Sequence, residues 1–297
     1  MQTIYSDMLE RLNAGLELLP DKPEENVENT LRALWFAASG EPRSVPHAMQ
    51  GELPPLATPE AIGRLDELVR RRLTGEPLAH ITGRQRFMEL EMLSGMQALI
   101  PRLETEQLVR ACIDLLHQLD ASTRPRVIDV CTGSGNIAFA IAHHVKTAIV
   151  AAADLSEEAI AFAQRNGAHL QLQDRVALYT GDLLTPFATP DHLDRTDLIV
   201  CAPPYICTAK VEQMAGEISR HEPRLAFDGG PFGVTILMRL IEDAPRFLRG
   251  GGWLAMEVGL GQGALLVKRL KTNNAYREVH GLADTDGAVR VVLARRQ

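Results

Sequence analysis

The amino-acid sequence is poor in the features that mark secreted, metal-binding and membrane-spanning chains. Its 297 residues include only four cysteines, and no two of them stand in a Cys-x-x-Cys spacing. A disulfide framework is therefore not expected, and the cysteine usage favours a reducing cytoplasm. No apolar run reaches about 18 residues, so no membrane-spanning helix is expected.

Positive charge is also scarce relative to negative charge. The formal net charge is −7, so we expect no general attraction for nucleic acid. The basic run Arg70-Arg71-Arg72 is interpreted as a solvated helix face rather than a nucleic-acid site. His143 and His144 have no cysteine or acidic residue at metal-ligand spacing, so no metal site is predicted. The chain contains neither a P-loop nor a Ser-His-Asp order.

The N-terminal part of the chain, residues 1–82, is predicted to be a helical domain. Apolar residues recur there at three- and four-residue spacing. The three helices predicted from this spacing cover residues 5–19, 25–38 and 59–74. Thr58 followed by Pro59 is a typical start for the last of them.

The rest of the chain divides into a short linker and an α/β domain. Residues 83–102 predict a β-hairpin linker with its turn at Ser94-Gly95. From residue 103 to residue 297 helices and strands alternate, which predicts a parallel sheet with crossover helices. The last two predicted strands would give this sheet an antiparallel edge.

Three successive strand ends carry residues suited to a nucleoside-type cofactor. The first predicted strand runs into Gly133 and Gly135, where the backbone can turn tightly and approach a ligand. Asp154 ends the second strand and can accept hydrogen bonds from ribose hydroxyls. Asp182 follows the third strand and can meet an adenine amino group. Both acids could instead have a purely structural role, Asp154 at the start of a helix and Asp182 in a turn.

The fourth predicted strand ends in D-L-I-V-C-A-P-P-Y, residues 197–205. Prolines lack N–H donors and fix φ, and the residue before a proline is held extended. Ala202-Pro203-Pro204 therefore presents a rigid row of carbonyl acceptors, and Tyr205 adds an aromatic wall. A dehydrogenase has no need for such a strand end. The stretch favours a methyltransferase that uses S-adenosylmethionine.

Several stretches together resemble the HemK/PrmC-type protein-(glutamine-N5) methyltransferases, which modify release factors or, in a sister group, a ribosomal protein. The resemblance spans most of the chain from about residue 67. In chain order its motifs are RRRLTGEPLAHITGRQRF, ALIPRLETEQLV, DVCTGSGNIAFAIA, VAAADLSEEAIAFAQRN, GDLL, APPY, EPRLAFDGGPFG and GGWLAMEVGLGQG.

This resemblance implies a Rossmann-like class I methyltransferase with a mixed seven-stranded sheet, behind a helical domain that helps to bind a protein substrate. It implies transfer of a methyl group from S-adenosylmethionine to a glutamine side-chain amide, as in the Gly-Gly-Gln loop of a release factor, with S-adenosylhomocysteine as product. The cofactor-binding residues expected on these grounds are Arg102, Thr132, Gly133, Ser134, Gly135, Asp154, Leu155, Asp182, Leu183 and Ala202. The expected catalytic residues are Ala202, Pro203, Pro204 and Tyr205, and Pro203, Tyr205 and Glu222 are expected to bind the substrate.

The chain departs from the family motif at three positions. Ala202 stands where the family has the asparagine of NPPY, and Cys131 and Leu103 replace a glycine and a proline. The missing asparagine oxygen would accept a hydrogen of the acceptor amide, so its loss puts the acceptor in doubt. The alternatives are a divergent paralogue that methylates a small-molecule amine, amide or hydroxyl, and a cofactor-binding protein without catalysis. Neither a nucleic-acid nor a membrane partner is expected.

Overall fold

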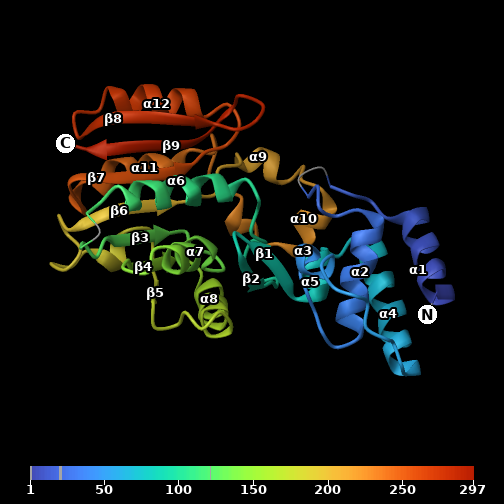
Figure 1. The fold of residues 1–297 in the computed structure, drawn as a ribbon. Helices are drawn as coiled ribbons and strands as arrows, with labels where there is room; N and C mark the ends of the chain where they lie inside the picture. Colours follow the sequence, from blue (N-terminus) through green and yellow to red (C-terminus); the bar gives the residue numbers. More distant parts are fainter. Residues whose placement is uncertain (1, 20–21, 121) are drawn as a thin grey trace. The chain divides into compact units, whose positions relative to one another are not determined.

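The computed structural model describes residues 2–19, 22–120 and 122–297. The chain forms two compact units (Figure 1). The first contains Met1–Met96 together with Ala215–Glu222, and the second contains Gln97–Met214 together with Pro223–Gln297. A short segment from the middle of the second unit's sequence thus belongs to the first unit. The predicted functional boundaries at residues 82 and 102 stay predictions.

The first unit is a helical bundle with a two-stranded hairpin. Its elements are α1 (Gln2–Gly15), α2 (Val27–Ala38), α3 (Val45–Ala48), α4 (Pro59–Leu73), α5 (Leu78–Thr82), β1 (Arg84–Phe87), β2 (Leu90–Leu93) and α10 (Gly216–His221). Asn26 and Thr58 cap α2 and α4 by accepting backbone N–H groups, which satisfies donors that the first turn leaves open. The core contains Leu12, Trp35 and Leu65, all fully buried.

The hairpin confirms the predicted element but corrects the position of its turn. β1 pairs antiparallel with β2, and Phe87 stands opposite Leu90. The turn therefore lies at Met88-Glu89, with Met88 in the left-handed region at φ 53°, and not at Ser94-Gly95. Burial of Phe87 and Leu90 on this short hairpin outweighs the local turn preference of a Ser-Gly pair.

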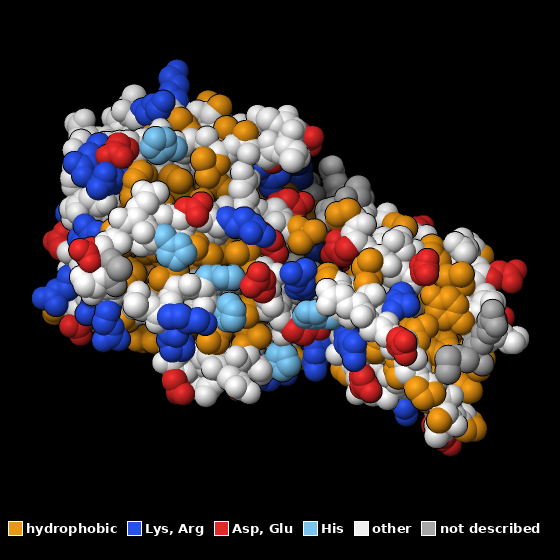
Figure 2. All heavy atoms as spheres, in the orientation of Figure 1, with side chains coloured by type: hydrophobic (Ala, Val, Ile, Leu, Met, Phe, Trp, Pro, Cys, Tyr) orange, Lys and Arg blue, Asp and Glu red, His pale blue; other side chains and the backbone are white. Residues whose placement is uncertain are grey.

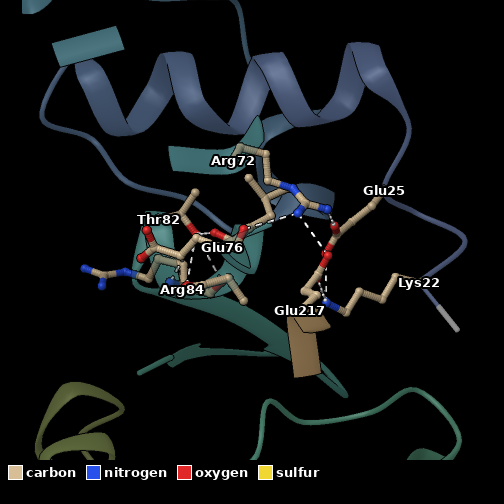
Figure 3. A network of polar contacts seen from close by, with 9 residues as sticks. Lys22, Glu25, Arg72, Glu76, Thr82, Arg84 and Glu217 are labelled. Atoms are coloured by element: carbon tan, nitrogen blue, oxygen red, sulfur yellow. Dashed lines mark hydrogen bonds and ion pairs between the residues drawn. The ribbon is translucent and has the colours of Figure 1, made fainter. Parts of the chain in front are cut away.

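A buried network of charged side chains lies in the first unit (Figure 3). Arg72 Nη2 lies 3.2 Å from Glu25 Oε2, and its Nη1 lies 3.0 Å from Glu217 Oε2. Lys22 Nζ donates to Glu217 Oε1 at 2.6 Å, so α10 is bound to two basic side chains. The interpretation of the basic run as a solvated face is wrong for Arg72, whose side chain is 1% exposed. Arg70, on the same helix, is 62% exposed.

The second unit is built on a seven-stranded mixed sheet of order β5-β4-β3-β6-β7-β9-β8 (Figure 1). The strands are β3 (Arg126–Val130), β4 (Ile149–Asp154), β5 (Val176–Thr180), β6 (Thr196–Cys201), β7 (Leu248–Glu257), β8 (Tyr276–Ala283) and β9 (Val289–Arg296). The first five are parallel, and β9 runs antiparallel to both β7 and β8. The predicted parallel sheet with an antiparallel edge is confirmed.

Helices connect the strands of this sheet. The longer ones are α6 (Thr105–His117), α7 (Asn136–His144), α8 (Glu157–His169), α11 (Thr235–Asp243) and α12 (Gly263–Lys271), and α9 (Thr208–Val211) is a single turn. β3 lies between β4 and β6 in the sheet. After β3 the chain first adds β4 and β5 on one side of it, and then crosses over to add β6 and β7 on the other side. The carboxyl ends of strands at such a switch point form the usual ligand-binding crevice of an open α/β sheet.

Two surface properties bear on the partners of the chain. No helix in the described part of the chain combines the length and the apolar character that crossing a membrane requires. Figure 2 shows basic and acidic side chains interspersed over the face of the second unit that it draws.

Candidate active site

A cavity of about 210 Å³ lies at the carboxyl ends of the parallel strands. Gly133 follows β3, Asp154 ends β4, Asp182 follows β5, and Ala202 follows β6; all four line the cavity. The residues that were predicted from four separate strand ends are thus brought together. Leu155, Leu183 and Ile236 add apolar surface to the same lining, which suits the flat rings of a nucleobase.

The glycine loop after β3 has two glycines with different functions. Gly133 has φ 53°, and a Cβ there would meet nothing within 4 Å, so its backbone faces open space. Gly135 has φ 82°, and a Cβ there would lie 2.4 Å from Phe139 Cε2. Gly135 therefore allows α7 to pack closely, whereas Gly133 leaves room for a ligand.

Cys131, in place of the family's glycine, also has a left-handed backbone with φ 59°. Its side chain lines the cavity and contacts the Cys201 thiol of the neighbouring strand β6. Burial and then the contact with Cys131 raise the pKa of the Cys201 thiol, so the Cys201 thiol is protonated at neutral pH. Cys131 thus lines the cavity and packs against the hydrophobic core cluster that contains Cys201.

Asp154 is held in place by backbone N–H groups. Its Oδ2 accepts from Gly133 N at 2.8 Å, and its Oδ1 accepts from Ser156 N at 3.0 Å. Burial raises the pKa of this carboxyl, and the two backbone hydrogen bonds oppose the rise. Each carboxylate oxygen retains further acceptor capacity toward the cavity, which fits the two hydroxyls of a ribose.

Asp182 has a partner that the sequence did not indicate. Arg239 Nη2 of α11 donates to Asp182 Oδ2 at 2.6 Å. The pair is roughly half exposed, so it orients the carboxylate more than it stabilises the fold. The second oxygen of Asp182 remains suited to an amino group such as that of adenine.

The predicted site residues divide into two groups. Those that line the cavity are Gly133, Asp154, Leu155, Asp182, Leu183, Ala202 and Pro204. Among the described residues, the predicted ones outside the lining are Arg102, Thr132, Ser134, Gly135, Pro203, Tyr205 and Glu222. Glu222 is buried and belongs to the first unit. The catalytic and substrate-binding roles of these residues stay predictions.

Tyr205 contacts a buried acid and a base that the sequence did not connect with it. Its hydroxyl donates to Glu257 Oε1 at 3.1 Å, and Arg290 Nη2 donates to the Tyr205 hydroxyl oxygen at 3.4 Å. Burial and then the Glu257 carboxylate raise the pKa of Tyr205. The phenol is therefore a fixed neutral group at neutral pH, suited to holding the motif in place rather than to accepting a proton.

Asp129, in β3, is a buried acid that sequence reasoning missed. Its side chain is 0% exposed, and its Oδ2 accepts from Thr132 Oγ1 at 2.6 Å. Burial raises the pKa of Asp129 to about 7, although its hydrogen bonds with Thr132 and Ala138 oppose this. Asp129 could have been recognised from the sequence, because it is a charged residue within an apolar strand, two residues before the glycine loop begins at residue 131.

We expect Asp129→Asn to change how stability depends on pH. Because the folded-state pKa lies above the ordinary carboxyl range, the folded chain holds this proton longer than the unfolded chain. The wild type therefore loses stability as the pH rises from about 4 to about 7, and the loss then levels off. From about pH 5 to pH 8 the free energy of unfolding of the variant, relative to wild type, should rise by roughly 2–3 kcal/mol. Urea titrations at both pH values measure this difference, and a constant difference would contradict it.

Two family models match separate parts of the chain. A PrmC N-terminal domain matches residues 46–83, and a methyltransferase small domain matches residues 110–232. The first match lies in the helical unit, and the second contains the strand ends that line the cavity.

Proteins with similar sequences are also methyltransferases. The chain is 39% identical over 239 residues to the release factor glutamine methyltransferase of Moorella thermoacetica, which covers 80% of this chain and 82% of that protein. It is 36% identical over 247 residues to the one of Streptomyces coelicolor, covering 83% and 85%. Among solved structures, the hMettl16 catalytic domain in complex with a 3′UTR hairpin superposes with a TM-score of 0.57 at 15% identity, over 89% of this chain and 91% of that one. At such low identity this likeness concerns the fold alone.

The cavity, the glycine loop and the strand-end acids fit S-adenosylmethionine, and the relatives at 36–39% identity are named as methyltransferases. The chain belongs to the HemK/PrmC family of release factor glutamine methyltransferases and is an S-adenosylmethionine-dependent methyltransferase.

Proposed function

We propose that this enzyme methylates the side-chain amide nitrogen of a glutamine in a protein acceptor of the peptide release factor class. The observation that carries the proposal is the position of Ala202 and Pro204, which line the same cavity as the nucleoside-binding acids Asp154 and Asp182. The names of the relatives at 31–39% identity support the glutamine acceptor. The formal net charge of −7 supports a protein acceptor rather than nucleic acid.

The residues of this chain act mainly by positioning. Asp154 and Asp182 hold the nucleoside, and the loop at Gly133 leaves room for the methionine portion. When bound, S-adenosylmethionine supplies an electrophilic methyl group. The carbonyl groups of the Ala202-Pro203-Pro204 segment accept hydrogens of the acceptor amide and orient its nitrogen toward that methyl. Transfer would form a nitrogen–carbon bond to the acceptor as the methyl–sulfur bond breaks with its electron pair remaining on sulfur, and one amide proton would pass to solvent water.

Ala202 weakens this arrangement in a defined way. An amide nitrogen is a poor nucleophile because its lone pair is delocalised, and alanine offers no side-chain oxygen to accept its second hydrogen. The chain therefore transfers methyl groups more slowly than a relative with asparagine at this position. An amine retains its own lone pair, so Ala202 is also the feature that favours the rival acceptor.

Methyl transfer to a release-factor fragment that carries the Gly-Gly-Gln loop tests the proposal. We expect one methyl group, mapped by tandem mass spectrometry to the loop glutamine, that depends on both enzyme and S-adenosylmethionine. The control is the same fragment with this glutamine replaced by alanine, which should remain unmodified. Transfer to small amines but not to the fragment, or binding of the cofactor without any transfer, would overturn the glutamine assignment.

A further inference from the structure

The side-chain amide of Gln262, just before α12, binds three backbone groups from three loops. Its Nε2 donates to the carbonyl oxygen of Tyr205 at 2.9 Å and to that of Gly233 at 3.1 Å. Its Oε1 accepts from the N–H of Gly259 at 2.9 Å. Both donor hydrogens and the acceptor of the carboxamide are thus matched to backbone groups.

Three glycines pack against the Pro204-Tyr205 segment, whose Tyr205 carbonyl Gln262 holds. A Cβ at Gly233 would lie 2.3 Å from the Tyr205 carbonyl oxygen, and one at Gly229 would lie 2.6 Å from the Pro204 carbonyl oxygen. A Cβ at Gly259 would lie 3.0 Å from Tyr205 Cδ2. The segment after β6 therefore packs closely against these three glycines, and it cannot move by even a few tenths of an ångström toward them without a steric clash.

Further contacts fix this segment on its other sides. Ile206 N donates to the Phe227 carbonyl oxygen at 2.9 Å, and Gly229 N donates to the Ile206 carbonyl oxygen at 2.8 Å. The Tyr205 hydroxyl is held by Glu257. Gln262 is the side chain that ties Tyr205's own carbonyl to the two loops that surround it.

We propose that Gln262 is a positioning residue for methyl transfer. The Tyr205 carbonyl, which Gln262 holds, and the Pro204 carbonyl, which packs on Gly229, stand at the two ends of Tyr205 and together fix its backbone. The fixed φ of Pro204 then restricts where the Pro203 carbonyl points. Gln262 acts through the motif and does not itself contact the acceptor. The inference rests on the proposed function, since it assigns Gln262 to the same motif.

Gln262→Glu tests this proposal most specifically, because glutamate keeps the shape of the side chain but lacks the two hydrogens that Gln262 donates to Tyr205 and Gly233. One carboxylate oxygen still accepts from Gly259, whereas the other faces two carbonyl oxygens that it repels. A displacement of the motif of the order of 1 Å can cost about a hundredfold in rate. We expect kcat to fall by about that factor, with the KM for S-adenosylmethionine unchanged. Loss of the two hydrogen bonds should lower the melting temperature, so the rates are compared at a temperature at which both proteins are fully folded. The control is Gln173→Glu, at an exposed glutamine, which should match wild type.

The pH profile separates positioning from a general structural role. As the pH falls, the introduced carboxyl takes up a proton and again donates to one of the two carbonyls. The ratio of variant to wild-type kcat should therefore rise toward acid pH, and a ratio that stays flat or near one would overturn the proposal.

Hydrogen–deuterium exchange tests the same contact without any acceptor. In Gln262→Glu the amides of residues 205–208 should exchange faster than in wild type, and Gln173→Glu should leave them unchanged. If wild type transfers no methyl group to glutamine yet this exchange difference appears, the proposed function fails and the positioning assignment stands. If exchange is the same in the variant and wild type, the positioning assignment fails whatever the acceptor is.

Discussion

Ala202→Asn is expected to raise kcat for methyl transfer to a glutamine acceptor by roughly a hundred- to a thousandfold. This is the size of effect that follows from adding or removing one hydrogen-bonding group at a developing charge. Ala202 lines the cavity and is only partly buried, so a longer side chain there can extend toward the acceptor. The asparagine oxygen accepts the second hydrogen of the amide and stabilises the positive charge that develops on nitrogen.

Steady-state rates with a release-factor fragment measure this gain. Ala188→Asn, at an exposed alanine, serves as the control and should leave the rate unchanged. Affinity for S-adenosylhomocysteine should be the same in wild type and Ala188→Asn. It is measured in Ala202→Asn as well, because Ala202 lines the cofactor cavity and a change in cofactor binding must be separated from the change in rate. An unchanged rate in Ala202→Asn, with the cofactor still bound, would show that an oxygen at this position contributes nothing.

Arg72→Met is expected to reduce the free energy of unfolding of the first unit by about 3–5 kcal/mol, the cost of breaking a buried ion pair from one side. Arg72 neutralises both Glu25 and Glu217, and these carboxylates are almost fully buried. Burial already raises the pKa of Glu25, while Lys22 and Arg72 oppose this. Removing the guanidinium therefore leaves two buried acids with Lys22 as their basic partner in the network.

Urea unfolding measures this loss unit by unit, because each unit has one tryptophan. Trp35 lies in the first unit and Trp253 in the second, so a Trp253→Phe background lets fluorescence report the first unit alone. Arg70→Met, from the exposed face of the same helix, is the control and should change stability by less than about 0.5 kcal/mol. Equal losses in the two variants would contradict the description of Arg72 as the centre of the network.

The sheet could be predicted because its signals are local. The central strands are short apolar runs, Thr58 caps its helix as expected, and the glycine loop marks the first crossover. The hairpin turn could not be predicted in the same way, since Met88-Glu89 carries no turn signal. The burial of Arg72 was also missed, because its partners lie 47 and 145 residues away in the sequence.

In the candidate site, too, the residues marked by local sequence signals could be predicted, whereas the contacts between distant residues could not. Asp154 and Asp182 were found because carboxyl ends of parallel strands meet at one edge, so strand-end positions converge in space. The contacts of Asp182 with Arg239, of Tyr205 with Glu257, and of Tyr205 with Gln262 each join positions more than 50 residues apart. No spacing rule connects such pairs, and only the folded chain shows them.

Calorimetric titration with S-adenosylhomocysteine tests the central claim most directly, which is that the cavity at the strand ends is the cofactor site. Wild type should bind with a clear heat signal. Asp154→Asn replaces an accepting oxygen with a donor and should weaken binding by roughly ten- to a hundredfold. Asp174→Asn, at an exposed acid, should bind as wild type does. Absence of heat with wild type at millimolar ligand, or equal affinities in Asp154→Asn and wild type, would contradict the assignment of this cavity.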